Sequence, residues 1–231
     1  MRLKNPFWGY TDLAIAAGML LPALGAMVVS IKLMGPAPKA VQAILGQSIL
    51  YAVLFAGVYF ALKKIYDEPV GEGLGLTIGP LAHWKPALFG VVLAIGLSAL
   101  GVALRTPQMT DPMKELLDSN LGVIVVGVAA TSIFPLCEEL AFRGFILPLL
   151  ARSCGLWGGI FLTAFPFALL HGPQYQWHWQ HIVLLTMAGA AFGWMRAFSQ
   201  STISAAVMHA TYNMTFMLAY LANQKELSGT W

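Results

Sequence analysis

The feature that most constrains this chain is its succession of long, uninterrupted apolar runs. Of its 231 residues, 58% are hydrophobic and 10% are charged, whereas an ordinary soluble domain is about 25% charged. A chain with so few charges cannot cover a water-facing surface, and a run of roughly 20 apolar residues is long enough to cross a bilayer. The sequence therefore predicts an all-α, polytopic transmembrane bundle of about seven spans, within a range of roughly six to eight.

Charged and Gly-rich segments separate the apolar runs and set the predicted boundaries. Lys63 and Lys64 end the second run, and Arg105 ends the third. The seven predicted spans are Leu13–Met34, Val41–Leu62, Pro86–Leu104, Leu121–Leu150, Leu156–His171, Ile182–Phe198 and Ser201–Ala222. The Pro112–Leu117 stretch predicts a short interfacial helix. Because the sequence shows no internal repeat, residues 1–231 are predicted to form a single membrane domain.

The first run and its flanks predict an ordinary span and not a cleaved signal peptide. Its apolar length exceeds the roughly 7–15 residues usual for a signal peptide. Aromatic residues at the ends of the runs are typical of the membrane–water interface. They are Phe7, Trp8 and Tyr10 before the first span, and Tyr175, Trp177 and Trp179 between the fifth and sixth.

Loop charge predicts the orientation and excludes one class of partner. The N-terminal side of a seven-span chain carries Arg2, Lys4, Lys63, Lys64, Lys85, Arg152 and Arg196, and the other side carries Lys39, Arg105, Lys114 and Lys225. The positive-inside rule then places the N-terminus in the cytoplasm. A short chain with minimal loops is typical of a bacterial or archaeal inner (plasma) membrane protein. The net charge of +3 is spread over loops, so no nucleic-acid partner is expected.

Ionisable residues inside predicted spans are costly and therefore point to function. They gather in three strings, Cys137-Glu-Glu-Leu-Ala-Phe-Arg-Gly144, Phe167-Ala-Leu-Leu-His171 and His209-Ala-Thr-Tyr-Asn213. Residues four apart share a helix face, so Glu139 can pair with Arg143, and His209 and Asn213 can point into one space. Glu138 lies about 100° round the helix from Glu139. It has no such local partner and is free to point elsewhere.

A carboxylate, two imidazoles and an amide in a low-dielectric cavity suit peptide hydrolysis. Glu138 can take a proton from water and deliver it to the leaving amine, and His209 and Asn213 can stabilise the oxyanion. A second mechanism fits the same residue types: Glu138, His171 and His209 are a possible zinc ligand set, with metal-bound water as the nucleophile. The sequence has no HExxH string, and it leaves both mechanisms open.

The three strings, in this order, resemble the CPBP family, the CAAX-processing and bacteriocin-processing (Abi) intramembrane proteases, whose relatives include the Ras-converting CAAX endopeptidases and the myxosortase-like proteases. The resemblance covers roughly Leu121–Met217, the predicted protease core. It implies that Glu138 is the catalytic glutamate and that His171 helps to activate the water. It also implies that Glu139 and Arg143 support the site, that His209 and Asn213 stabilise the oxyanion, and that no metal or other cofactor takes part.

Other interpretations of the same residues stay open. Glu139 and Arg143 can equally be a structural ion pair, and Cys137 is a nucleophile only if something activates it. A different class of function is a non-catalytic membrane protein, either a transporter or a scaffold or immunity factor with a degenerate site. A transporter of the inverted-repeat type is expected to have broken helices in matching halves, and the sequence shows no such symmetry. A pseudoenzyme is expected to have lost at least one motif residue, and none is missing here.

The sequence thus predicts an intramembrane endopeptidase. Its expected partners are the lipid bilayer and a peptide or protein substrate with a membrane-embedded segment. Three substrate classes remain open: a prenylated or CAAX-like C-terminus, a C-terminal sorting helix and a leader or signalling peptide.

Overall fold

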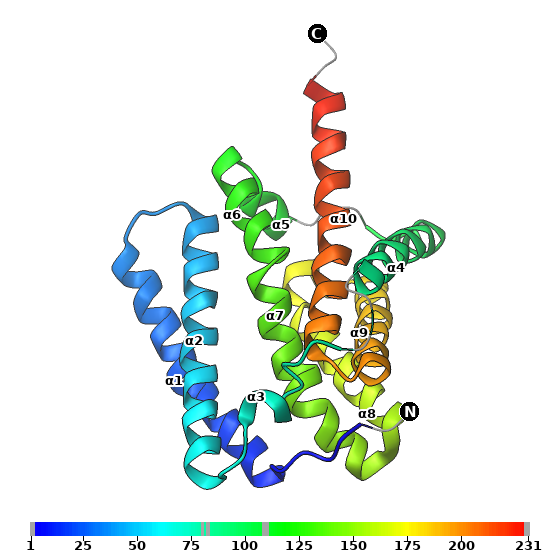
Figure 1. Cartoon of the computed structure of the whole chain (residues 1–231). Helices are drawn as coiled ribbons and strands as arrows, with labels where there is room; N and C mark the ends of the chain where they lie inside the picture. Colours follow the sequence, from blue (N-terminus) through cyan, green and yellow to red (C-terminus); the bar gives the residue numbers. More distant parts are fainter. Residues whose placement is uncertain (1–2, 80, 82–83, 108–110, 229–231) are drawn as a thin grey trace.

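All regular elements in the described part of the chain are helices, which confirms the predicted all-α class (Figure 1). A computed structural model describes residues 3–79, 81, 84–107 and 111–228. The elements are α1 (Tyr10–Met34), α2 (Lys39–Ile65), α3 (Val70–Gly73), α4 (Trp84–Ala103), α5 (Asp111–Leu116), α6 (Asn120–Ala130), α7 (Ile133–Glu139), the π-helix η1 (Leu140–Ile146), α8 (Leu147–Leu170), the 3₁₀ turn η2 (Pro173–Tyr175), α9 (Trp179–Ser199) and α10 (Thr202–Ser228).

Within the described residues, five helical stretches are long and apolar enough to cross a membrane: α1, α2, α4, the run Asn120–Leu170 and α9. The long run contains two predicted spans, because its helical geometry breaks at Cys154 and Gly155, where Gly155 adopts a φ of +77°. Beyond this break, Gly159 packs closely against Ala151. The seventh predicted span, α10, is not one of these five stretches, because polar residues such as His209 lower its mean hydropathy. These elements make a multi-pass membrane protein and are compatible with about seven spans.

Contacts between the connections show which of them lie at the same end of the bundle. At one end, Tyr10 donates a hydrogen bond to Ser153 at 2.6 Å, and the Thr202 N–H donates to the Gly75 carbonyl at 2.9 Å. At the other end, Lys39 forms an ion pair with Glu115, and a His181 ring nitrogen lies 3.1 Å from the Pro107 carbonyl oxygen. Successive connections therefore alternate between the ends, as the predicted topology requires.

The N-terminal segment before α1 differs from its prediction. Trp8 was predicted to lie at the membrane interface, but its side chain is fully buried, so this prediction is wrong. Its ring stacks on Phe145, and its indole N–H donates to the Phe145 carbonyl at 3.0 Å. That carbonyl belongs to the π-helix, so Trp8 ties the N-terminal segment to the middle of the chain. Trp177 and Trp179 are 60% and 59% exposed, which is compatible with an interfacial position.

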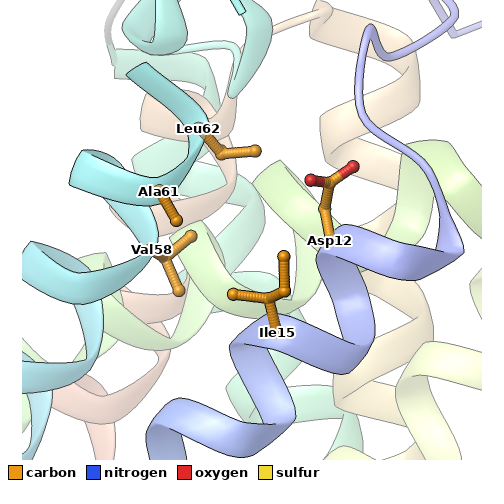
Figure 2. A pocket seen from close by; sticks show the side chains of 5 residues that line it. All are labelled: Asp12, Ile15, Val58, Ala61 and Leu62. Carbon is orange, nitrogen blue, oxygen red and sulfur yellow. The ribbon is translucent and has the colours of Figure 1, made fainter. Parts of the chain in front are cut away.

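The start of the α1–α2 hairpin contains a small hollow lined by Asp12, Ile15, Val58, Ala61 and Leu62 (Figure 2). The Asp12 carboxylate caps α1 by accepting a hydrogen bond from the Gly9 N–H at 2.7 Å. It also accepts from the Tyr66 phenol at 2.8 Å, and this bond raises the pKa of Tyr66. Because Asp12 is used in these two bonds, we interpret the hollow as a structural feature of the hairpin.

Candidate functional site

The predicted site residues converge where a break and a π-helix interrupt the Asn120–Leu170 run. α6 ends at Ala130, α7 begins at Ile133, and its last two residues are Glu138 and Glu139. The next seven residues form the π-helix η1, which contains Arg143. π-Helical turns are rare and occur frequently at functional sites. The irregular backbone thus coincides with the strongest of the three sequence strings.

Glu139 and Arg143 form the ion pair that their spacing predicts. Arg143 Nη1 lies 2.9 Å from Glu139 Oε1, and both side chains are completely buried. Arg143 Nη2 also donates to the Gly189 carbonyl of α9 at 2.7 Å. The guanidinium lies over the Phe167 ring, 4.6 Å from its centre. These partners offset the cost of burying both charges, and they join η1 to α8 and α9.

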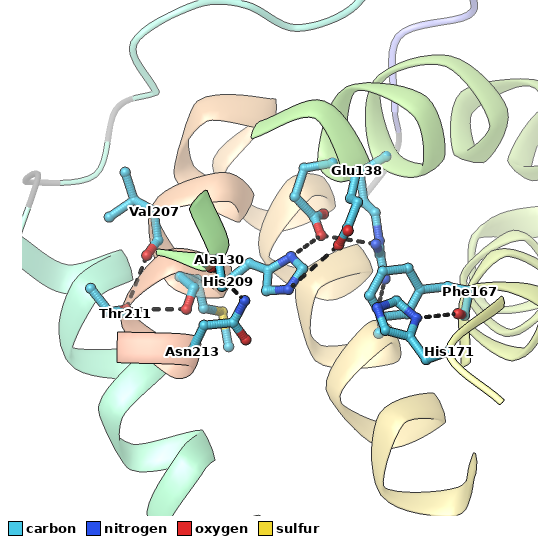
Figure 3. A network of polar contacts seen from close by, with 12 residues as sticks. Ala130, Glu138, Phe167, His171, Val207, His209, Thr211 and Asn213 are labelled. Atoms are coloured by element: carbon cyan, nitrogen blue, oxygen red, sulfur yellow. Dashed lines mark hydrogen bonds and ion pairs between the residues drawn. The ribbon is translucent and has the colours of Figure 1, made fainter. Parts of the chain in front are cut away.

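His209 of α10 contacts both glutamates through its two ring nitrogens, and Figure 3 shows its ring facing Glu138. Its Nδ1 is 3.0 Å from Glu139 Oε1, and its Nε2 is 3.8 Å from Glu138 Oε2. The ring is stacked on Phe192 at a centroid distance of 4.4 Å. Because a carboxylate accepts hydrogen bonds, the contact with Glu139 requires Nδ1 to carry a proton. This contact fixes the ring and directs Nε2 toward Glu138.

Glu138 has no partner on its own helix turn, as predicted, but two distant helices hold it. Its side chain is 14% exposed, in contrast to the fully buried Glu139. The Tyr51 phenol of α2 donates a hydrogen bond to Glu138 Oε1 at 3.2 Å. Sequence reasoning missed Tyr51. The available signal was a polar pair within an apolar span, since Gln47 and Tyr51 are four residues apart and their side chains are hydrogen-bonded at 3.0 Å.

His171 is the C-cap of α8 and reaches the site through an aromatic ring. Its Nδ1 lies 2.8 Å from the Phe167 carbonyl oxygen, so Nδ1 is the protonated nitrogen and Nε2 is left for another partner. The Phe167 ring lies 4.7 Å from the His171 ring and 5.8 Å from the His209 ring. Phe167 therefore contacts both histidines, which the sequence predicts to be in one site.

Asn213 shares a face of α10 with His209, but its described hydrogen bond leads elsewhere. Its Nδ2 donates to the carbonyl of Ala130 at 2.8 Å. Ala130 is the last residue of α6, where the helix break leaves carbonyls without helical partners. Asn213 therefore joins α10 to the break before the glutamates. Its amide has a second N–H, and the predicted oxyanion role depends on that group.

The connection between α8 and α9 lies near this cluster. Tyr175 in η2 stacks on His181 at 4.3 Å. Burial, and secondly the charge of Glu138, raises the pKa of the Tyr175 phenol. The phenol is therefore neutral at physiological pH.

The geometry does not bring the alternative zinc ligands together. Within the described ranges, no three His, Cys, Asp or Glu side chains are grouped closely enough to hold one metal ion. Glu138 and His209 approach each other, but His171 is directed by its bond to Phe167. The three residues thus do not fit a zinc site in this arrangement.

Comparison with known proteins finds a family match in the second half of the chain. Residues 120–215 match the family model described as type II CAAX prenyl endopeptidase Rce1-like. No curated protein and no solved structure matches the chain. The matched range agrees closely with the predicted protease core and contains all six predicted site residues. It does not include α1, α2 or α4, so Tyr51 lies outside it.

Proposed function

We propose, from the match of residues 120–215 to the Rce1-like family of CAAX-type intramembrane proteases, that this chain hydrolyses peptide bonds with a water activated by Glu138. The observation that carries the proposal is the contrast between adjacent carboxylates. Glu139 is fully buried and is bound to Arg143 and His209. Glu138 is 14% exposed, and its Oε2 lies 3.8 Å from His209 Nε2, within ion-pair range but beyond hydrogen-bond distance. Glu138 is therefore the carboxylate that a water and a peptide can reach.

In the proposed reaction, Glu138 removes a proton from water as the water oxygen attacks the peptide carbonyl carbon. The carbon–nitrogen bond of the tetrahedral intermediate then breaks, and the proton passes from Glu138 to the leaving amine. The products are a new carboxylate and a new amine, so Glu138 returns to its starting state. General acid–base catalysis of this kind contributes about 10²- to 10⁴-fold to the rate.

His209 stabilises the oxyanion in this proposal, and its contacts specify its protonation state. Nδ1 is protonated because it faces Glu139 at 3.0 Å. Nε2 donates a hydrogen bond to an oxyanion only if it is protonated too, so the active ring is an imidazolium. The second N–H of Asn213 is the further donor, and loss of one oxyanion donor typically costs about 10²- to 10³-fold in kcat.

His171 completes the proposed site by orienting the water. Its Nδ1–H is used by the Phe167 carbonyl at 2.8 Å, which leaves Nε2 as a hydrogen-bond acceptor in the neutral ring. An acceptor on α8 and a carboxylate on α7 can hold the two hydrogens of one water. This arrangement uses only side chains, without a metal or other cofactor.

The proposed substrate is a peptide tethered to the bilayer, cleaved in a bacterial or archaeal inner membrane. The family description favours a prenylated C-terminal tail as the first substrate to test. A C-terminal sorting helix and a leader peptide are the other classes that fit a site within a helical membrane bundle.

The test is cleavage of quenched fluorescent peptides of the three classes by the purified full chain in proteoliposomes. We expect cleavage of at least one class by the wild type, and about 10²- to 10⁴-fold lower kcat for Glu138→Gln. Glu68→Gln, at an exposed loop carboxylate, is the matched control and should retain wild-type kcat. An active Glu138→Gln variant, or a wild type that cleaves none of the three classes, would overturn the proposal.

A further inference from the structure

We propose that Tyr51 of α2 is a positioning residue for Glu138, so that the active site is completed by a helix outside the family-matched region. The inference rests on the proposed function of Glu138. Tyr51 donates its hydrogen bond to Glu138 Oε1 at 3.2 Å across 87 positions of sequence. The matched region begins at residue 120, so this contact joins the N-terminal hairpin to the protease core.

The neighbouring Gln47 determines the direction of the hydrogen bond. Gln47 Nε2 lies 3.0 Å from the Tyr51 hydroxyl oxygen and acts as a donor. The phenol has one hydrogen and accepts with its lone pairs. Because Gln47 occupies an acceptor site on the oxygen, the phenol hydrogen is available to the carboxylate. The chain Gln47–Tyr51–Glu138 thus consists of donors that all point toward the proposed base.

Ring packing holds Tyr51 in place independently of its hydroxyl. The Tyr51 ring contacts Phe134 edge-on at 5.7 Å and Phe55 at 6.1 Å. Phe134 lies four residues before Glu138, so both are on one face of α7. Tyr51 therefore contacts that face at two points, a ring and a carboxylate. Removal of the hydroxyl alone should leave the ring contacts and the fold intact.

The two oxygens of Glu138 face different helices, and this gives Tyr51 its function. Oε1 is held by Tyr51 from α2, while Oε2 faces His209 Nε2 of α10 at 3.8 Å. Without the phenol, the carboxylate is free to close the 3.8 Å gap to a protonated His209 and to form a direct, hydrogen-bonded ion pair. That pair would occupy both the base and the oxyanion donor. Tyr51 thus keeps Glu138 and His209 apart and available for water and substrate.

The test compares two Tyr→Phe variants of the same helix in the proteoliposome assay. In Tyr51→Phe, loss of a hydrogen bond to a charged group should lower kcat about 10- to 100-fold, with KM unchanged. The pH–rate profile should change as well, because Glu138 exchanges the phenol for protonated His209 as its hydrogen-bond partner. The neighbouring Glu139, Arg143 and His209 are unaltered in this variant.

Tyr59→Phe is the matched control, since Tyr59 is 49% exposed and its hydroxyl has no hydrogen bond within the described part of the chain. It should match the wild type in kcat, KM and pH profile. Gln47→Leu should reproduce the Tyr51→Phe effects at smaller size. If Tyr51→Phe behaves like Tyr59→Phe, or loses kcat without a change in the pH profile, the positioning role is wrong.

Wild type and Glu138→Gln are measured beside these variants, which separates the two proposals. An inactive wild type or an active Glu138→Gln variant means that the proposed function has failed. A cleaving wild type, an inactive Glu138→Gln variant and a fully active Tyr51→Phe variant mean that only the role of Tyr51 has failed.

Discussion

The α1–α2 hairpin and the core of α6–α10 meet the bilayer in different ways. In the most apolar window of α1, and also of α2, 6% of residues are buried within the protein, whereas 44% are buried in α9. Large side chains of the hairpin, such as Leu33 at 82% exposed, are available to lipid. The core instead buries an ion pair and a histidine. Functional residues of the hairpin are therefore expected to be isolated polar side chains that reach the core. Those of the core are expected to belong to networks of buried hydrogen bonds and ion pairs.

The largest stability effect should come from breaking the buried ion pair of the core. Arg143→Met leaves the Glu139 carboxylate buried beside His209 without its guanidinium partner. Breaking one side of a buried pair typically costs about 3–5 kcal/mol. We expect a large fall in the thermal unfolding temperature of the detergent-solubilised protein and complete loss of cleavage.

The hairpin offers a matched control with the same four-residue spacing. Lys63 and Asp67 form an ion pair at 3.8 Å, but both side chains are exposed. Exposed pairs contribute little, so Lys63→Met should leave unfolding temperature and kcat unchanged. Equal destabilisation by Arg143→Met and Lys63→Met would contradict the distinction between core and hairpin.

The same distinction explains which parts of the site could be predicted from sequence. A helix repeats every 3.6 residues, so the Glu139–Arg143 pair and the shared face of His209 and Asn213 follow from spacing alone. The Tyr51–Glu138 bond does not, because it depends on how two distant helices are rotated against each other. The direction of Asn213 toward Ala130 also needed the structure, since the break after α6 creates that acceptor.

Prediction of the fold from sequence is limited in the same way, because contacts between distant segments leave no local pattern. Long apolar runs predict the helices to within a few residues, as α9 shows, because crossing a bilayer demands them. Trp8 was misassigned because an aromatic residue before a span usually lies at the interface. Here the Trp8 indole instead donates to the Phe145 carbonyl of the π-helix at 3.0 Å. No local pattern near Trp8 encodes a partner 137 positions away.

A moderate effect should come from adding one methyl group to the core. A Cβ at Gly189 would lie 2.9 Å from Arg143 Nη2 and 3.2 Å from the Ala164 Cα. Gly189→Ala must therefore displace the guanidinium or separate α8 from α9, and overpacking of this kind costs about 1–3 kcal/mol. Thermal unfolding and kcat should both fall, but less than in Arg143→Met.

Gly18→Ala in α1 is the corresponding hairpin variant. A Cβ at Gly18 would meet nothing within 4 Å, and alanine is the better helix former. Its unfolding temperature should equal or slightly exceed that of the wild type. A Gly189→Ala variant as stable and active as Gly18→Ala would mean that the core tolerates expansion around Arg143.

Removal of metal is expected to have the smallest effect on kcat, because the proposed site uses only side chains of the core. Glu138 and His209 lie within 3.8 Å of each other, so two members of a ligand set are near, but the His171 ring is directed by the Phe167 carbonyl. Exhaustive chelation should leave kcat unchanged, and elemental analysis of the active protein should find substoichiometric zinc. The Glu138→Gln protein is the control, since loss of a ligand would lower its zinc content and loss of a base would not. Stoichiometric zinc whose removal stops cleavage, and whose return restores it, would instead assign Glu138 as a metal ligand, and the water would then be activated by the ion.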